Sequence, residues 1–325
     1  MTDAALSSQT PFDASKDAKQ RLHLCSWAHL LVAACTGFSL YLSVANIKDQ
    51  GFANFYYAAA VRSMMQNWHA FYFVSLDSRG FVSIDKPPVG FWIQTASALV
   101  FGYHGWSLLL PEALAGAGSV LLIYAIVRRF FGTAAGVISA LAMAISPINV
   151  AVARNNTPDG LLVFTLLASI LCFTHAVQRG RLTWLLAAFA LVGVGFNIKM
   201  MEAYLVLPGM AIAYLLCGHI SFKRRVGQLM AATLGLALVS FSWATTVWLT
   251  PASERPYVGS TQNNNIYSLI FGYNGINRLL PKGWSIFGMT NGAASTSSRP
   301  VLSISPAAAR IGENGPQGIF RLFDH

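Results

Sequence analysis

The sequence is poor in charge: only 10% of its 325 residues are Asp, Glu, Lys or Arg, and 54% are hydrophobic. Soluble domains carry about 25% charged residues. A chain with so few charges lacks the polar side chains that a water-facing surface needs. This deficit excludes an ordinary soluble domain and predicts a protein surrounded by lipid.

Acidic residues are the scarcer charge, with 12 Asp and Glu against 22 Lys and Arg and a net charge of +10. In a soluble protein this excess would suggest nucleic acid. Here the basic residues fall in short clusters between apolar runs, without a stripe of interleaved aromatics. We therefore expect no nucleic-acid partner and interpret the clusters as signals of membrane topology.

Cysteine is also scarce, and the four residues lie in or beside apolar runs: Cys25, Cys35, Cys172 and Cys217. None has the spacing of a metal site, and none lies in the long polar loops where a disulfide would form. They are interpreted as small apolar residues.

The apolar runs predict an all-α polytopic membrane protein, because a spanning helix needs about 20 apolar residues. About seven transmembrane helices are expected, near 24–45, 107–127, 133–153, 159–177, 182–198, 203–218 and 228–250. Residues 1–23 are expected to be disordered and cytoplasmic, and the first helix to be uncleaved rather than a signal peptide. Two further stretches, near 54–68 and 89–103, are expected to be interfacial helices.

The basic clusters give the predicted orientation, because cytoplasmic loops are enriched in Lys and Arg. Every second connection is short and basic, at 16–21, 128–129, 179–181 and 223–225. The connections 46–106, 154–158, 199–202 and 251–325 then lie outside. The last of these ends without a closing element, so we expect the chain to be incomplete, with a membrane domain over 24–250.

Asp85-Lys86-Pro87-Pro88 is the first candidate for chemistry on the predicted outer side. Lys86 is a point charge suited to phosphate, and Asp85 is a candidate metal ligand. The two prolines fix the backbone and cannot continue a preceding helix. A surface turn with an incidental ion pair is the simpler alternative.

Two further polar groups lie at predicted helix junctions. Arg154-Asn155-Asn156-Thr157-Pro158-Asp159 separates two helices, and Asp159 is also well placed as an acidic residue at a helix N-terminus. Lys199 and Glu202 separate the next two helices, where an ion pair without function is the simpler interpretation. The first outer loop adds polar residues beside tyrosines that are expected at a membrane interface in any case: Asp49, Asn54, Tyr56, Tyr57 and Arg62.

These strings resemble the protein O-mannosyltransferase superfamily of lipid-linked sugar transferases, which includes the bacterial aminoarabinose transferases. The resemblance runs from about residue 27 to the end, and the chain resembles only the N-terminal half of such enzymes. The strings that carry it are 54–61 (NFYYAAAV), 85–92 (DKPPVGFW), 110–116 (LPEALAG), 153–159 (ARNNTPD) and 272–275 (GYNG).

The resemblance implies a membrane glycosyltransferase fold of the GT-C type, a polyprenyl-phosphate sugar donor and a lipid, protein or glycan acceptor. It implies a bacterial inner-membrane location, with the site on the outer face. Lys86, Arg154 and Lys199 are expected to bind the donor phosphate, and Asp159 or Asp49 to act as the base. Asp85 is the expected ligand of a divalent metal, and the remaining site candidates are Asn54, Tyr57 and Asn155.

One departure affects the expected base. Many relatives have an acidic pair just before the position of Tyr56, whereas this chain has Ala53 and Asn54 there. The alternative is therefore a non-catalytic fragment, or a membrane protein that binds or transports lipid-linked sugars. Transporters place ionisable residues near the bilayer midplane, whereas the polar residues here gather on one predicted side, which favours chemistry at the surface.

Overall fold

A computed structural model of the chain describes residues 11–217 and 220–275, with side chains from Trp27 onward. This part is helical and contains no β-strand, only two isolated bridges that tie residues 75, 82, 83 and 257 together. Residues 1–10, and the part of the predicted last loop that follows residue 275, lie outside the described residues.

The first helix, α1 (Pro11–Val44), is longer than the sequence predicted. Residues 11–23 were expected to be disordered, but they are helical because Ala, Lys, Gln, Arg and Leu favour helix and proline is compatible with a first turn. Beyond the far end of α1, Asn46 has a φ of 53°. Asparagine tolerates this left-handed conformation, which commonly ends a helix.

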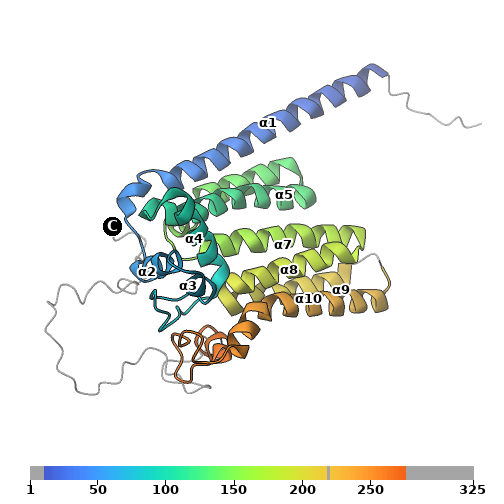
Figure 1. The fold of residues 1–325 in the computed structure, drawn as a ribbon. Helices are drawn as coiled ribbons and strands as arrows, with labels where there is room; N and C mark the ends of the chain where they lie inside the picture. The colour runs from blue at the N-terminus through green and yellow to red at the C-terminus, as the bar shows by residue number, and fades with distance from the viewer. Residues whose placement is uncertain (1–10, 218–219, 276–325) are drawn as a thin grey trace, which may run out of the picture. The chain divides into compact units, whose positions relative to one another are not determined.

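Helix α5 (Gly105–Ile145) folds back on itself at Gly132. Its 41 residues would extend about 62 Å as one straight helix, twice the roughly 30 Å core of a bilayer. Gly132 has a φ of 86° and breaks the helix. Val120 and Tyr124 before the break pack with Ala140 and Ala144 after it, so α5 is a helical hairpin, as Figure 1 shows.

A second reversal joins α8 (Leu182–Lys199) to α9 (Leu207–Cys217) through the 3₁₀ helix η2 (Met200–Val206). A Cβ atom at Gly195 would lie 3.3 Å from that of Ala203. The rings of Phe196 and Tyr204 stack with centroids 5.0 Å apart. The chain therefore turns back within η2.

The remaining long helices are α7 (Asp159–Arg179) and α10 (Phe222–Leu249). By length and composition, five apolar segments of the described chain can cross a membrane. Seven were expected, and the difference arises because two adjacent pairs of predicted helices each form one segment, at the two reversals. The predicted helix 133–153 also divides at Pro147, which starts the short α6 (Pro147–Ala153), because the residue before a proline is driven out of the helical region.

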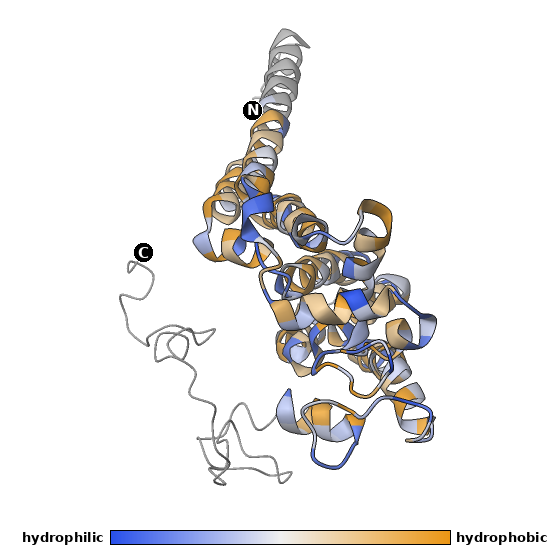
Figure 2. Ribbon diagram, turned by 60° about the vertical axis from the view of Figure 1, so that its left-hand side comes forward, coloured by the Kyte–Doolittle hydropathy of each residue, from blue (hydrophilic) through white to orange (hydrophobic). Residues whose placement is uncertain are grey.

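The long helices lie side by side in Figure 1 and have two chemically different ends. We call one end the polar end; the segments that meet there are 45–106, 146–158, 200–206 and 250–275. We call the opposite end the basic end; its segments are 128–133, 179–182 and 220–225. Arg154 hydrogen-bonds the carbonyls of Leu42 and Ala45 at the polar end, and Arg129 hydrogen-bonds Gln178 at the basic end. In Figure 2 the helices are mostly orange and the connections at the polar end mostly blue.

Three shorter helices cover the polar end: α2 (Phe55–Met64), α3 (Trp68–Tyr72) and α4 (Pro88–Phe101). They fall within or beside the two stretches predicted as interfacial helices. The indole of Trp92 donates to the carbonyl oxygen of Phe71 at 2.7 Å, and that of Trp243 in α10 donates to Tyr72 at 3.0 Å. These bonds fix the short helices on the ends of the long ones.

Candidate functional site at the polar end

Asp85 and Lys86 are buried at the start of α4. Pro87 is extended, with a ψ of 169°, and Pro88 is the first helical residue, a position at which its missing N–H removes no helix bond. The helix expected near 89–103 therefore begins at the last residue of this motif, Pro88. The prolines fix the backbone so that both charged side chains face the polar end of the bundle rather than extending α4.

The Asp85 carboxylate binds two groups. Its Oδ2 accepts from Lys86 Nζ at 2.9 Å, and its Oδ1 accepts from the phenol of Tyr57 at 3.3 Å. Asp85 and Lys86 are each 7% exposed. Removing one partner of such a buried ion pair leaves a charge without compensation, which costs about 3–5 kcal/mol. The pair is therefore not the incidental surface turn that the sequence left open.

Asn274, far away in the sequence, completes this cluster. Its Oδ1 accepts from Lys86 Nζ at 2.9 Å, and its Nδ2 donates to the backbone oxygen of Asp85 at 2.8 Å. The Tyr273 ring lies 5.7 Å from Nζ. Tyr273 is the last residue of a π-helical turn, Ser268–Tyr273, and Asn274 caps it. This geometry is rare but frequent at functional sites. Sequence reasoning included GYNG in the resemblance but gave these two residues no role.

The two tyrosines of α2 stay protonated beside Asp85. Burial, and then the Asp85 carboxylate, raises the pKa of Tyr56 to about 12. The same two causes raise the pKa of Tyr57 further still. Because a protonated phenol can donate a hydrogen bond, Tyr57 holds the carboxylate in place over the range in which proteins function.

Lys199, Asp159 and Glu202 form a second charged cluster at this end. The ammonium group of Lys199, at the end of α8, binds the carboxylate of Asp159 at the start of α7. It also binds Glu202 Oε2 at 2.9 Å. The ion pair between Lys199 and Glu202 that the sequence suggested is present, and the structure adds Asp159 to it. These side chains remain partly exposed.

Asn54 and Asn156 join the first loop to the second. Asn54 Oδ1 caps α2 by accepting from the backbone N–H of Tyr57. The side chain of Asn156 accepts from the backbone N–H of Asn54 at 2.8 Å and donates to its carbonyl at 3.0 Å. Gln94 Nε2 donates to the backbone oxygen of Asn156 at 2.9 Å. The residue that replaces the expected acid is thus part of the scaffold of the site.

Two predicted site residues have structural partners here. Arg154 Nη1 donates to the carbonyls of Leu42 and Ala45, both at 2.8 Å, and so satisfies the C-terminal end of α1. Asn155 Oδ1 accepts from the backbone N–H of Thr157 and shapes the turn before α7. Neither contact was predicted, and neither joins Arg154 or Asn155 to Lys86.

Glu112 is a buried carboxyl that sequence reasoning passed over, because it lies inside an apolar run. Its Oε2 accepts from the backbone N–H of Leu161 at 3.0 Å, in the first turn of α7. The residue is 0% exposed, and its Oε1 has no hydrogen-bond partner. An acidic group is favourable at a helix N-terminus, and here it is supplied from α5, so Glu112 helps to position the turn that carries Asp159.

The remaining predictions concern Asp49 and a metal. Asp49 lies exposed on the short helix η1 (Ile47–Gln50), and its side chain makes no hydrogen bond or ion pair with the described part of the chain. Within residues 27–217 and 220–275, no three His, Cys, Asp or Glu side chains gather as a metal site would need. Both oxygens of Asp85 are already bound to Tyr57 and Lys86. This donor set does not fit a divalent ion, and we derive no step through one.

The helical hairpins and the covered polar end define the class of protein: a polytopic membrane protein with a GT-C fold. Two solved structures of ArnT from Cupriavidus metallidurans share this fold with a TM-score of 0.52 each. The match to the apo structure is 23% identical and covers 69% of this chain and 42% of the ArnT chain. The structure bound to undecaprenyl phosphate is 21% identical and covers 76% and 43%.

Sequence comparison agrees with the fold. Residues 85–243 match the family described as dolichyl-phosphate-mannose-protein mannosyltransferase. Two proteins of Bacillus subtilis are proposed by name to be mannosyltransferases. YycA is 49% identical over 78% of this chain, and YkcB is 51% identical over 74% of it. Together these similarities support the superfamily of protein O-mannosyltransferases and aminoarabinose transferases.

The chain spans about a third of the length of these curated relatives, 36% of YycA and 34% of YkcB. A third relative is the undecaprenyl phosphate-alpha-4-amino-4-deoxy-L-arabinose arabinosyl transferase of Pseudomonas aeruginosa. It is 28% identical over half of this chain, which corresponds to 30% of its own length.

Proposed function

We propose that this chain acts in a membrane glycosyltransferase that moves a mannose-like hexose from a polyprenyl-phosphate donor to an acceptor hydroxyl. The reaction takes place at the polar end, on the outer face of a bacterial plasma membrane. The observation that carries the proposal is the buried cation of Lys86, held between Asp85 and Asn274 at the end of the membrane helices. We infer that this cation meets the phosphate of the lipid donor.

Three independent features support a phosphate beside Lys86. First, a lysine ammonium is a common phosphate ligand, and α4 begins directly after it. Second, the matched family and the Pseudomonas aeruginosa relative are named for transfer from lipid-linked sugars, and one ArnT structure contains undecaprenyl phosphate. Third, the short basic connections all lie at the opposite end of the bundle, which the positive-inside rule assigns to the cytoplasm.

The proposed reaction is a displacement at the anomeric carbon. The acceptor oxygen forms a bond to this carbon, the bond from the carbon to the phosphate oxygen breaks, and the lipid phosphate leaves with the electron pair. Lys86 stabilises the charge that develops on that phosphate. A carboxylate takes the acceptor proton, for which Asp159 and Asp49 are our candidates. General-base catalysis typically contributes about 10²–10⁴-fold.

Asp159 is the better placed of the two, because Lys199 and Glu202 hold it at the start of α7, whereas Asp49 is exposed. Lys199 also supplies a second cation at this end, as the resemblance implies. The acceptor lies outside what these residues define, since acceptor pockets are shaped by side chains that fold analogy does not supply.

The test is turnover of labelled polyprenyl-phosphate mannose by purified protein, compared with the paired variant Asp85→Asn/Lys86→Met. The pair is changed together because Lys86→Met alone leaves a buried carboxylate without its cation and threatens folding. The paired variant keeps the bond from Tyr57 and similar volumes. We expect it to remain folded and to lose donor turnover.

Two outcomes contradict the proposal. Turnover in the folded paired variant at the wild-type rate would remove Lys86 from the chemistry. The second outcome is measured in a preparation complemented with the segments present in the longer relatives. Saturable donor binding by the wild type, without transfer to any acceptor, would indicate a lipid-binding protein instead.

A further inference from the structure

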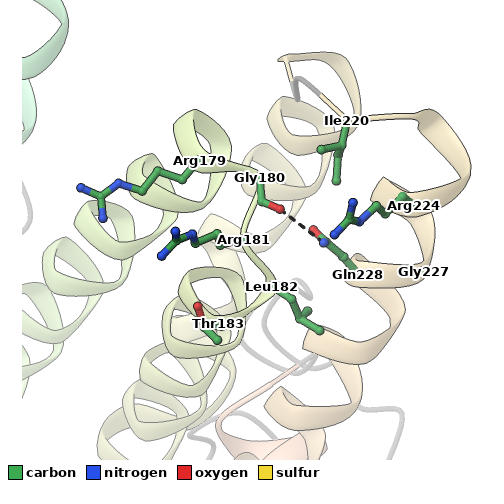
Figure 3. A pocket seen from close by; sticks show the side chains of 9 residues that line it. All are labelled: Arg179, Gly180, Arg181, Leu182, Thr183, Ile220, Arg224, Gly227 and Gln228. Carbon is green, nitrogen blue, oxygen red and sulfur yellow. Dashed lines mark hydrogen bonds between the residues drawn. The ribbon is translucent and has the colours of Figure 1, made fainter.

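A cavity of about 760 Å³ opens at the basic end, opposite the proposed site. It lies between the turn that joins α7 to α8 and the first two turns of α10 (Figure 3). Three arginines are prominent in its wall: Arg179, Arg181 and Arg224. We call it the basic pocket.

Hydrogen bonds and one close contact shape this pocket. The buried Gln228 donates from Nε2 to the carbonyl of Gly180 at 3.4 Å, drawn as a dashed line in Figure 3. The hydroxyl of Tyr214 in α9 donates to Gln228 Oε1. Gly180 has a φ of 61°, and a Cβ there would lie 2.9 Å from Ile220. The pocket is therefore bounded by three packed helices and a glycine turn.

Two of the three arginines of the pocket differ from the other arginines at the same end. Arg128 and Arg129 donate to Tyr124 and Gln178, and Arg225 donates to the carbonyl of Leu215. The side chains of Arg181 and Arg224 make no hydrogen bond or ion pair with the described residues. The third arginine of the pocket, Arg179, lies 5.9 Å from the centre of the Trp184 ring. Topology alone predicts arginines at this end, but it does not predict that two that line a cavity make no hydrogen bond or ion pair with the described residues.

Acidic side chains are missing from the surroundings. Those described in the structure belong to the polar end or to the first turns beside it: Asp49, Asp77, Asp85, Glu112, Asp159, Glu202 and Glu254. The cations of the basic pocket therefore have no carboxylate among the described side chains to neutralise them. The first turn of α8, at Leu182 and Thr183, also lines the pocket and adds the partial positive charge of a helix N-terminus.

We propose that the basic pocket binds the phosphate headgroup of an anionic phospholipid. The shared chemistry is that of any phosphate, but the pocket lies at the ends of membrane-spanning helices, where headgroups are the concentrated source. Basic pockets between transmembrane helices on the cytoplasmic side are suited to anionic lipids. Arginine adds a planar fork of donors that matches phosphate oxygens. This proposal stands independently of the sugar-transfer site.

The experiment measures lipid binding by the full chain in detergent, using native mass spectrometry with added phosphatidylglycerol. Arg181→Gln and Arg224→Gln remove one guanidinium each. Lys223→Gln is the matched control, because it removes the same charge from the same turn of α10 but lies outside the pocket lining. We expect each arginine variant to weaken binding about tenfold or more, since hydrogen bonds to charged groups are the stronger ones. Lys223→Gln should change binding less than twofold.

Two controls make the proposal falsifiable. All variants must elute as the wild type does in size-exclusion chromatography, and Arg224→Gln serves if Arg181→Gln fails to fold. Equal losses in Lys223→Gln and the arginine variants would show a diffuse charge effect and overturn the site. Equal binding of phosphatidylcholine, or displacement of the lipid by stoichiometric inorganic phosphate, would overturn the assignment to an anionic phospholipid.

Discussion

Replacement of Glu112 tests how the start of α7 is held in place. Glu112→Ala removes the acceptor of the Leu161 N–H and leaves this amide buried. Glu112→Gln keeps an oxygen that can accept from Leu161 at the observed 3.0 Å. The new side chain also carries an N–H₂ group. Gln94 lies within hydrogen-bonding reach of Glu112 and its Oε1 has no partner, so this N–H₂ can donate to it.

The expected magnitudes differ in sign or size. An unsatisfied buried amide costs about 1–3 kcal/mol, and the void left by the shortened side chain adds to that cost. Glu112→Ala should therefore lower the apparent unfolding temperature by roughly 2–10 °C. Glu112→Gln should leave the unfolding temperature unchanged or raise it. The substitution replaces Glu112 Oε1, which has no donor, with an N–H₂ group that can donate to Gln94 Oε1.

The assay is thermal unfolding of detergent-solubilised protein followed by size-exclusion fluorescence. Both variants should be expressed with Asp159 and Lys199 intact, so that only the contact between α5 and α7 changes. An apparent unfolding temperature that falls equally in the Gln and Ala variants would refute the reasoning, because the geometry requires only an acceptor at Oε2.

Three further predictions follow from the polar end. Gly90→Ala should destabilise the protein by about 1–3 kcal/mol, because the new Cβ would lie 2.6 Å from that of Pro158; Gly37→Ala, with nothing within 4 Å, is the control, and equal unfolding temperatures for the two variants would contradict the packing. Asn274→Ala should lower donor affinity about tenfold, since Lys86 loses an acceptor worth about 1.5 kcal/mol; isothermal titration that shows an unchanged affinity would argue against it. The raised pKa values of Tyr56 and Tyr57 mean that the folded state holds these protons more tightly than the unfolded state. This stabilisation is complete below the ordinary pKa of 10, and the part due to Tyr56 is lost as pH rises through about 12. Ultraviolet titration should therefore show less tyrosinate near pH 11 than in denatured protein, and Tyr57→Phe should not remove a signal there, because the pKa of Tyr57 is raised further still.

Much of the fold could be predicted because lipid imposes simple constraints on a sequence. Apolar length and the alternation of basic connections predicted the order and direction of the helices. The same constraints do not show that two predicted helices pair as one hairpin across the break at Gly132, or that Pro147 divides another. The helicity of residues 11–23 was missed because polar residues with good helix propensity can extend a helix beyond the apolar run that starts it.

The contacts within the candidate site were predictable only where the two residues are neighbours in sequence. Asp85-Lys86 and Lys199 with Glu202 are such cases. Asn274 was missed because its contacts to Lys86 and Asp85 span 188 and 189 residues, and the loop that carries it has no periodicity. Arg154 was assigned to a phosphate from its charge alone, whereas its recorded bonds are to the C-terminal carbonyls of α1.

The central claim is that Lys86 meets the phosphate of a polyprenyl lipid at the polar end. Equilibrium binding of undecaprenyl phosphate to the purified chain, measured for the wild type and for Asp85→Asn/Lys86→Met, tests it most directly. The account predicts saturable binding that weakens at least about tenfold in the folded paired variant, as expected for the loss of a charged hydrogen bond. Equal affinities in the two proteins would contradict it.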